Sequence, residues 1–349
     1  MAGNNVALVA GGLGVIGRAL VEHFAARDGW EVIGLSRRAP DFDTSARYEQ
    51  VDLQDAAATT AALARFGRVT HVFYAAYQEH KDPLTSTSVN LGMLQTLTRA
   101  AEQLPSLKRV VLYEGVKYYG VHLGPFKTPA KESDARHLPP NFYYDQEDWL
   151  RAAAAGKSWD MTALRPDVCC GFAVGNPMNL TLVIAVYAAI CKELGVPLRF
   201  PGSPAAWRGL AQVTDAGLLA RASEFVATQG PGGEAYNVTN GDLFRWEQLW
   251  PAFARDFGME TGWPLPLRLS EFMADKAPVW ERIVARHGLK PYAFETIAAW
   301  GFGDFIFNCG YDVISSTTKL RQAGFAEVVD SEEMFLRMFG EFRRLKVIP

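Results

Sequence analysis

The sequence has no apolar stretch long enough to cross a membrane. Its longest nearly apolar run, residues 180–191, falls short of the about 20 residues that a spanning helix needs. The first strand pattern begins almost at the N-terminus, which leaves no room for a signal peptide. We therefore expect a cytoplasmic protein without membrane contact.

The sequence also has no large excess of either charge, few cysteines and no paired histidines. The 349 residues include 35 Lys and Arg against 38 Asp and Glu, so no basic face for nucleic acid is expected. The four cysteines, two of them adjacent at Cys169 and Cys170, do not make a disulfide framework and fit a reducing compartment. The six histidines have neither an HExxH motif nor a paired spacing, so no metal site is predicted.

The chain does contain a glycine-rich turn between a strand pattern and a helix pattern. The apolar residues 6–10 lead into a GxxGxxG sequence, and apolar residues then recur at helical spacing. The glycines allow a tight turn and close approach of the backbone to phosphates, which the free N–H groups of the helix face. This spacing resembles that of extended short-chain dehydrogenases. The predicted dinucleotide contacts here are Gly11, Gly14, Val15, Ile16 and Gly17.

The end of the second strand pattern, residues 31–36, favours NADPH over NADH. NAD sites tend to place an Asp or Glu about 20 residues after the glycines, whereas this chain has Ser36, Arg37 and Arg38. Two guanidinium groups suit a 2′-phosphate, and no carboxylate is present to repel it. The alternative interpretation is a solvated basic turn.

The third and fourth strand patterns, residues 48–53 and 70–76, predict further cofactor contacts. Asp52 would accept a hydrogen bond from the adenine amine. The fourth pattern ends in small residues, as expected where backbone passes close to a ligand. The predicted contacts are Asp52, Leu53, Ala75 and Ala76.

Alternating strand and helix patterns up to about residue 166 predict right-handed βαβ units and a doubly wound parallel sheet, the Rossmann-type α/β fold. Strands five and six are expected at 108–113 and 161–165, and residues 235–239 are expected to return to the sheet. We expect an NADP-binding domain over residues 1–175, with its sheet completed by about 205–240.

Residues 176–204 and 241–349 are expected to form a smaller, mostly helical substrate lobe. Helices are predicted at 179–194, 246–257 and 331–345. The loop 120–140, which contains four prolines, is long for a compact domain and is a candidate substrate lid.

A Tyr and a Lys four residues apart are the usual catalytic pair of short-chain dehydrogenases, and Tyr113 and Lys117 have that spacing. We reject this pair because Tyr113 closes a strand, where this spacing does not give the helical neighbour geometry. Tyr113 is expected to pack at the strand end. Lys117 lies just beyond strand five, at the sheet edge where open α/β sheets bind ligands.

A set of short motifs extends over nearly the whole chain. They include Gly-Val-Lys-Tyr-Tyr at 115–119, Gly-Pro-Phe at 124–126, Asn-Phe-Tyr-Tyr-Asp-Gln-Glu-Asp at 141–148, Arg-Pro at 165–166 and Asn-Pro-Met-Asn-Leu at 176–180. In these motifs the chain resembles the progesterone 5β-reductase and iridoid synthase family of atypical short-chain reductases. The doubled tyrosine before an acidic pair, with a lysine upstream, is specific.

The resemblance implies that the catalytic pair is Lys117 and Tyr143, with Tyr144 the less favoured tyrosine. It also implies NADPH-dependent reduction of C=C bonds conjugated to a carbonyl, in which the phenol hydrogen-bonds the carbonyl oxygen as hydride reaches the β-carbon. We expect the neighbouring ammonium to lower the pKa of the phenol, which then stabilises the enolate.

Two positions depart from the family pattern. Glu114 stands where the family carries Thr or Ser, and strand alternation predicts that it points away from Lys117. Lys127 to Pro129 replace an aromatic of the plant members, so a smaller enone or enal is expected rather than a steroid. Phe126 and Trp207 are predicted substrate contacts, with packing as the alternative.

Two other functions stay open at this point. The same Tyr143 and Lys117 site would reduce aldehydes or ketones directly if the carbonyl carbon lay under the nicotinamide. A non-catalytic NADP-binding sensor is disfavoured, because a sensor needs no acid. The expected partners are a small enone or carbonyl substrate, no nucleic acid and no membrane, with a homodimer left open.

Overall fold

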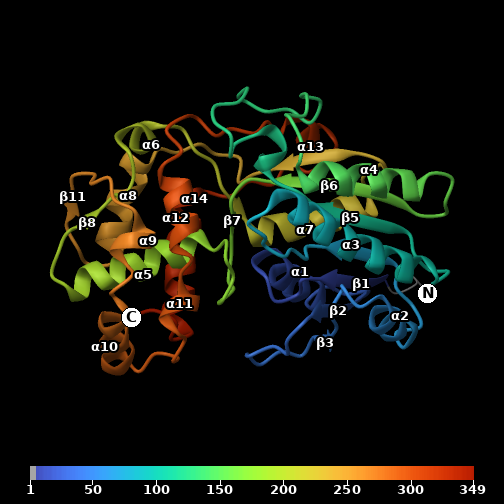
Figure 1. Cartoon of the computed structure of the whole chain (residues 1–349), viewed down its shortest axis with the longest axis horizontal. Helices are drawn as coiled ribbons and strands as arrows, with labels where there is room; N and C mark the ends of the chain where they lie inside the picture. The colour runs from blue at the N-terminus through green and yellow to red at the C-terminus, as the bar shows by residue number, and fades with distance from the viewer. Residues whose placement is uncertain (1–4) are drawn as a thin grey trace.

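The computed structural model describes residues 5–349. Its main feature is a seven-stranded parallel sheet with strand order β10-β6-β5-β4-β1-β2-β3 (Figure 1). This sheet confirms the predicted Rossmann-type α/β fold. The strands are β1 (Asn5–Ala10), β2 (Trp30–Ser36), β3 (Arg47–Gln50), β4 (His71–Tyr74), β5 (Arg109–Tyr113), β6 (Asp160–Pro166) and β10 (Ala235–Val238).

Both faces of the sheet are buried, as parallel strands between helices require. Along β1 the side chains alternate between two cores, with Leu8 and Ala10 in one core and Ala7 and Val9 in the other. Helices α2, α3 and α4 cover the first core, and α1 and α7 cover the second. Their bounds are α1 (Val15–Ala25), α2 (Ala56–Ala64), α3 (Pro83–Glu102), α4 (Phe142–Ala154) and α7 (Ala216–Thr228).

Most of the remaining chain forms a helical lobe beside the sheet, on the left in Figure 1. Its centre is a core rich in aromatic residues, such as Trp250, Phe253 and Phe339. Helix α5 (Leu180–Glu193) is buried from Leu180 to Cys191, so the longest apolar run of the sequence is an interior helix. The other lobe helices are α6 (Pro204–Arg208), α8 (Trp246–Asp256), α9 (Leu269–Phe272), α10 (Ala277–His287), α11 (Phe294–Ile297), α12 (Trp300–Phe307) and α14 (Ser331–Arg344).

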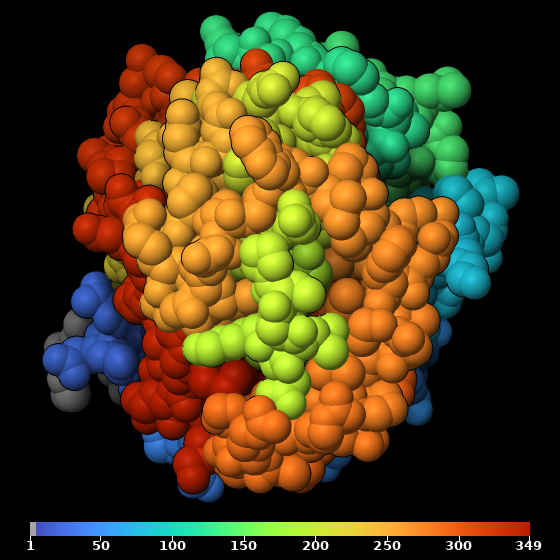
Figure 2. Space-filling model, turned by 90° about the vertical axis from the view of Figure 1, so that its left-hand side faces the viewer, coloured from blue at the N-terminus to red at the C-terminus, as the bar shows by residue number. Residues whose placement is uncertain are grey.

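Two pairs of short parallel strands complete the fold. They are β7 (Cys169–Cys170) with β9 (Thr214–Asp215), and β8 (Leu198–Arg199) with β11 (Thr261–Gly262). Figure 2 shows the outer face of the lobe, where the yellow-green chain that follows α5 lies between orange segments that come later in the sequence. Within residues 5–349, no helix combines the length and apolar character needed to cross a membrane.

The predicted elements are found with boundaries shifted by one to three residues, and three differences bear on the site and the domains. Strand β3 ends at Gln50 and β4 at Tyr74, before the residues that line the cavity described below. Helix α13 (Thr318–Gln322) contacts β10, and Leu320 and Phe325 join the core of the sheet. This part of the predicted 241–349 lobe therefore packs with the nucleotide domain, because its apolar side chains are buried against the sheet.

The predicted lid, residues 120–140, is anchored at its centre. Ala130 donates its backbone N–H to the carbonyl of Ile314 at 2.8 Å. The backbone carbonyl of Glu132 accepts a hydrogen bond from Arg165 at 3.2 Å. The Glu132 carboxylate accepts another from the backbone N–H of Asn237 at 2.7 Å. Opening this loop as one piece would break all of these hydrogen bonds.

Candidate active site

A single cavity extends along the carboxyl edge of the sheet and is closed on its far side by the helical lobe. The ends of β1, β2, β4, β5 and β6 all contribute to its wall, as expected for a ligand site in an open α/β sheet. The predicted site residues that line it are Gly11, Gly14, Val15, Ile16, Ser36, Arg37, Arg38, Asp52, Leu53, Ala75, Ala76, Lys117 and Tyr143.

The glycine-rich turn leaves room for phosphates at the start of α1. Gly11 has φ +77°, and a Cβ on it would lie 2.7 Å from the carbonyl oxygen of Ala75. Gly17 lies outside the cavity wall, and a Cβ there would collide with the carbonyl of Gly11. The helix N-terminus faces the cavity, no side chain caps α1 and its first turn holds no acidic residue, an arrangement that is chemically suited to an anion.

The arginines after β2 lie at one end of this cavity. The backbone N–H of Arg38 donates to the hydroxyl of Ser36 at 3.3 Å, and its guanidinium donates to the carbonyl of Val174 at 3.3 Å. Arg37 is exposed on the cavity wall beside it. Asp52 accepts a hydrogen bond from the N–H of Gln54 at 3.0 Å. The guanidinium of Arg38 also lies 3.9 Å from the exposed carboxylate of Asp41. This end of the cavity therefore presents two cations, one of them already facing a carboxylate.

Lys117 and Tyr143 line the same cavity although 25 residues separate them in the chain. Lys117 lies in the short 3-10 helix η1 (Val116–Tyr119) directly after β5, and Tyr143 lies in the first turn of α4. The pair thus comes from two elements that meet at the sheet edge. The Tyr113 hydroxyl lies 2.6 Å from that of Ser223, and the residue belongs to the buried core that α1 and α7 cover, which confirms its predicted packing role. Tyr113 also contributes to the cavity wall.

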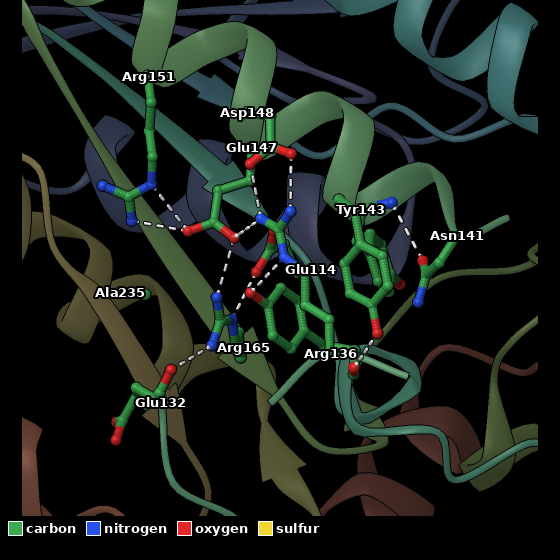
Figure 3. Close-up of polar contacts among 12 residues, drawn as sticks. Glu114, Glu132, Arg136, Asn141, Tyr143, Glu147, Asp148, Arg151, Arg165 and Ala235 are labelled. Atoms are coloured by element: carbon green, nitrogen blue, oxygen red, sulfur yellow. Dashed lines mark hydrogen bonds and ion pairs between the residues drawn. The ribbon is translucent and has the colours of Figure 1, made fainter. Parts of the chain in front are cut away.

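Asn141 links the two segments. Its amide donates to the backbone carbonyl of Lys117 at 3.0 Å. Its side-chain oxygen accepts the backbone N–H of Tyr143 at 3.1 Å (Figure 3). Asn141 is therefore both the N-cap of α4 and a bridge to η1. The sequence motif contains this residue, but its role became visible only in the structure.

Burial controls the ionisation of Tyr143 and Lys117. It raises the pKa of the Tyr143 phenol, and the charges of Tyr77 and Glu114 act in the same direction. Burial also lowers the pKa of Lys117, against the opposing effect of Glu79. The prediction that the ammonium lowers the pKa of the phenol is therefore wrong for this structure, because desolvation dominates. The phenol stays protonated at neutral pH and can donate a hydrogen bond.

Gly115 makes space for that phenol. A Cβ at Gly115 would lie 3.3 Å from the hydroxyl of Tyr143 and 3.5 Å from the carbonyl oxygen of Pro166. The phenol is thus located where the ends of β5 and β6 meet.

Glu114 belongs to a buried ion network (Figure 3). It accepts a hydrogen bond from Arg165 at 2.6 Å, and Arg165 also donates to Glu147 at 3.0 Å. The Glu114 carboxylate is therefore paired with Arg165 and not with Lys117, although Glu114 also contributes to the cavity wall. Its second carboxylate oxygen has no partner within residues 5–349, and burial raises its pKa to about 8.

Phe126 and Trp207 do not line the cavity. Phe126 packs against the cluster of Tyr118 and Tyr144, and the ring of Trp207 packs 5.1 Å from that of Phe200. These side chains are used for packing, which was the alternative interpretation of both residues. The apolar wall on the lobe side comes instead from Trp246, Phe302, Phe305 and Ile306.

Several polar residues of the cavity wall were missed by the sequence analysis, namely Tyr77, Gln78, Gln146 and Asp167. Tyr77, Gln78 and Asp167 follow the ends of β4 and β6. The same edge argument that selected Lys117 would have found them. Gln146 lies one helical turn after Tyr143, which was also a usable signal.

The family of this chain follows from its similarity to known proteins. A family model described as a PRISE-like Rossmann-fold domain matches residues 42–349. The chain belongs to this family. This membership confirms the resemblance predicted from the sequence motifs.

Three relatives match nearly the whole chain at 33% identity. The short chain dehydrogenase gsfE of Penicillium aethiopicum matches over 98% of this chain and 99% of its own length. The (S)-8-oxocitronellyl enol synthase CYC2 of Camptotheca acuminata matches over 99% and 93%, and the 3-oxo-Delta(4,5)-steroid 5-beta-reductase of Arabidopsis thaliana over 99% and 93%. The chain is therefore an oxidoreductase of the short-chain dehydrogenase type.

Solved structures support the same fold. The UDP-glucose 4-epimerase of Thermus thermophilus, solved as a complex with NAD, is 20% identical with a TM-score of 0.68, over 97% of this chain and 99% of that one. A UDP-glucose 4-epimerase from Thermotoga maritima, solved with UDP-glucose, is 17% identical with a TM-score of 0.70, over 97% of this chain and 99% of that one. At these identities the similarity establishes only the architecture.

Proposed function

We propose that the protein is an NADPH-dependent reductase of activated C=C bonds in small α,β-unsaturated carbonyl compounds. The observation that carries this proposal is the shared cavity of Lys117, Tyr143 and the glycine-rich turn. The family relatives named as an enol synthase and as a steroid 5-beta-reductase support the same reaction class.

The residues present fit a nicotinamide dinucleotide phosphate. The uncapped N-terminus of α1 suits the pyrophosphate, and Gly11 lets the backbone approach it. Arg37 and Arg38 at the end of β2 suit the 2′-phosphate, and Asp52 suits the adenine amine. When bound, this cofactor supplies the hydride.

Tyr143 serves as the hydrogen-bond donor to the substrate. Its phenol keeps its proton, because burial raises the pKa, and can therefore hydrogen-bond the carbonyl oxygen. Negative charge grows on that oxygen as the enolate forms, so this bond is stronger in the transition state than in the ground state. One such donor is worth roughly 2.7–4 kcal/mol of barrier.

Lys117 supplies positive charge at the same wall, and the apolar residues Trp246, Phe302 and Phe305 exclude water from the other side. Less water strengthens the electrostatic effect of both catalytic groups. The backbone of Lys117 is held by Asn141, so the two groups keep a defined relation before substrate arrives.

The test supplies NADPH with a small enone and, in a second reaction, with a saturated aldehyde of similar size. The expected product is the saturated ketone, with little turnover of the aldehyde. Consumption of the carbonyl with the C=C bond intact would contradict the proposal and favour direct carbonyl reduction.

Tyr143→Phe removes only the phenol hydroxyl. We expect kcat for the enone to fall by about 100-fold to 1,000-fold, with NADPH affinity nearly unchanged. Tyr144→Phe is the matched control at the next position, because the Tyr144 hydroxyl donates to the carbonyl of Tyr118 at 2.6 Å and is expected to affect stability rather than kcat. Full turnover by Tyr143→Phe would refute the assignment.

A further inference from the structure

Asp167 is a buried carboxylate without a full set of partners. It directly follows β6 and lines the candidate active-site cavity. One oxygen accepts the N–H of Val168 at 2.7 Å, whereas the other is buried and has no hydrogen-bond partner within residues 5–349. Such an orphaned acceptor leaves the charge of the carboxylate uncompensated within the protein, which is costly.

No cation of the described chain compensates Asp167. The titratable groups that sense its charge are the thiols of Cys169, Cys170 and Cys309, and burial raises the pKa of each of them. The thiols therefore stay neutral near pH 7. Burial also raises the pKa of Asp167 to about 7, opposed only by the N–H of Val168.

The position of Asp167 identifies the end of the cavity that it serves. The preceding residue, Pro166, has its carbonyl oxygen 3.5 Å from the Cβ position of Gly115, which is itself 3.3 Å from the phenol oxygen of Tyr143. Arg37 and Arg38 lie instead after β2, with β1, β4 and β5 between β2 and β6 in the sheet. Asp167 is thus at the catalytic end and not at the 2′-phosphate end.

We propose that the Asp167 carboxylate faces the nicotinamide end of the cofactor and stabilises its oxidised, cationic form over its reduced, neutral form. The inference rests on the proposed function, because it takes the hydride to be delivered beside Tyr143. Loss of a hydride leaves the nicotinamide ring with a positive charge. A fixed, unpaired carboxylate in a water-poor wall attracts that charge at no cost of reorganisation.

This arrangement couples cofactor binding to protonation. Below about pH 7 the free protein holds Asp167 partly protonated. Binding of NADP+ then releases that proton to solvent, whereas binding of NADPH does not. The affinity for NADP+ relative to NADPH therefore rises with pH and levels off above the pKa of Asp167.

The test measures the dissociation constants of NADP+ and NADPH by calorimetry between about pH 5 and pH 8.5, without substrate. In the wild-type protein, the ratio of NADP+ affinity to NADPH affinity is expected to rise at least about tenfold. Using the ratio cancels the titration of the 2′-phosphate, which both forms carry. In Asp167→Asn the ratio is expected to be independent of pH and at least about tenfold lower near pH 8.

Asp52→Asn is the matched control. It changes a carboxylate of the same cavity near the adenosine half, which is identical in both redox forms, so both affinities change by the same factor. A ratio independent of pH in the wild-type protein would overturn the inference without any variant. An equal loss of both affinities in Asp167→Asn would also overturn it. This experiment does not measure enone reduction, so a negative result here does not contradict the proposed reaction. Likewise, failure to reduce an enone does not change the expected ratio of cofactor affinities.

Discussion

At the scale of single residues, the site depends on which charges are paired and which are left free. Glu114 is paired with Arg165 at 2.6 Å, whose guanidinium also lies 3.4 Å from the centre of the Tyr118 ring. The carboxyl group that comes three residues before Lys117 is therefore bound to Arg165 in the protein interior. The ammonium of Lys117 is not paired with it, which leaves that charge for the proposed contacts with cofactor and substrate.

Arg38 is predicted to set the preference for the phosphorylated cofactor. Arg38→Ala removes one cation from the end of β2, so we expect the ratio of kcat/KM for NADPH to that for NADH to fall by about tenfold to a hundredfold. This corresponds to the roughly 1.5–3 kcal/mol of a charged hydrogen bond. Steady-state kinetics with both cofactors measures the ratio.

The exposed Arg282 on α10 offers a control for this variant, because Arg282→Ala removes the same charge outside the cavity wall. The ratio should stay at the wild-type value in the control. An unchanged ratio in Arg38→Ala as well would favour the alternative of a solvated basic turn.

At the scale of elements, the site is assembled where the exit of β5 meets the start of α4. Lys117 comes from η1 and Tyr143 from α4, so neither element alone forms this part of the cavity wall. The two hydrogen bonds of Asn141 fix the backbone of Lys117 relative to that of Tyr143. The ring nitrogen Nε2 of His137 lies 3.1 Å from the same Lys117 carbonyl and donates to it when that nitrogen carries the proton, which adds a second bridge from the loop.

Two variants of Asn141 separate helix capping from positioning. Asn141→Asp keeps an acceptor for the N–H of Tyr143 but loses the donor to Lys117, so we expect kcat to fall about tenfold or more with little change in KM for NADPH. Asn141→Ala also loses the cap and should lower the free energy of unfolding by about 1 kcal/mol. Kinetics and urea unfolding measure the two effects.

Asp330 provides the matched capping control, since it caps α14 by accepting the N–H of Glu333 at 2.9 Å. Asp330→Ala should cost a similar free energy of unfolding and leave kcat unchanged. If Asn141→Asp keeps wild-type kcat, Asn141 is a cap alone.

At the scale of the whole molecule, two buried carboxyl groups make stability depend on pH. Burial raises the pKa of Glu114 to about 8 and that of Asp167 to about 7. Both groups have pKa values near 4 in the unfolded chain. At pH values between the unfolded-state and folded-state pKa of each group, the folded state binds more protons than the unfolded state. The free energy of unfolding therefore falls as pH rises.

We therefore expect the free energy of unfolding to fall by on the order of a few kcal/mol from about pH 5 to pH 8 and to level off above that. Urea unfolding at a series of pH values measures it, and the combined Glu114→Gln and Asp167→Asn variant should have a flatter profile. For Glu147, the effect of burial is outweighed by the charges of Arg165, Arg151 and Arg136, so the pKa is lowered. Protonation of Glu147 therefore reduces stability only in acid. A steady rise of stability from pH 5 to 8 would contradict this prediction.

The sequence by itself determined the architecture and the part of the cavity wall that the sheet edge and the glycine-rich turn form. Its strand and helix periodicities are local, and so is the glycine-rich turn, in which neighbouring residues both form the structure and face the ligand. The same holds for Lys117, because the carboxyl edge of a parallel sheet is where ligands bind whatever the remaining chain does. Tyr143 was selected by its motif and not by geometry.

Only the tertiary structure decided which side chains share a wall and which charges remain unpaired. Phe126 and Trp207 have the residue type of a substrate wall, but packing within the loop and the lobe uses them, and Phe302 and Phe305 take that place. The raised pKa values of Tyr143 and Asp167 follow from burial by segments far apart in the chain. Desolvation depends on everything that surrounds a group in three dimensions, and this information is absent from the spacing of residues in a sequence.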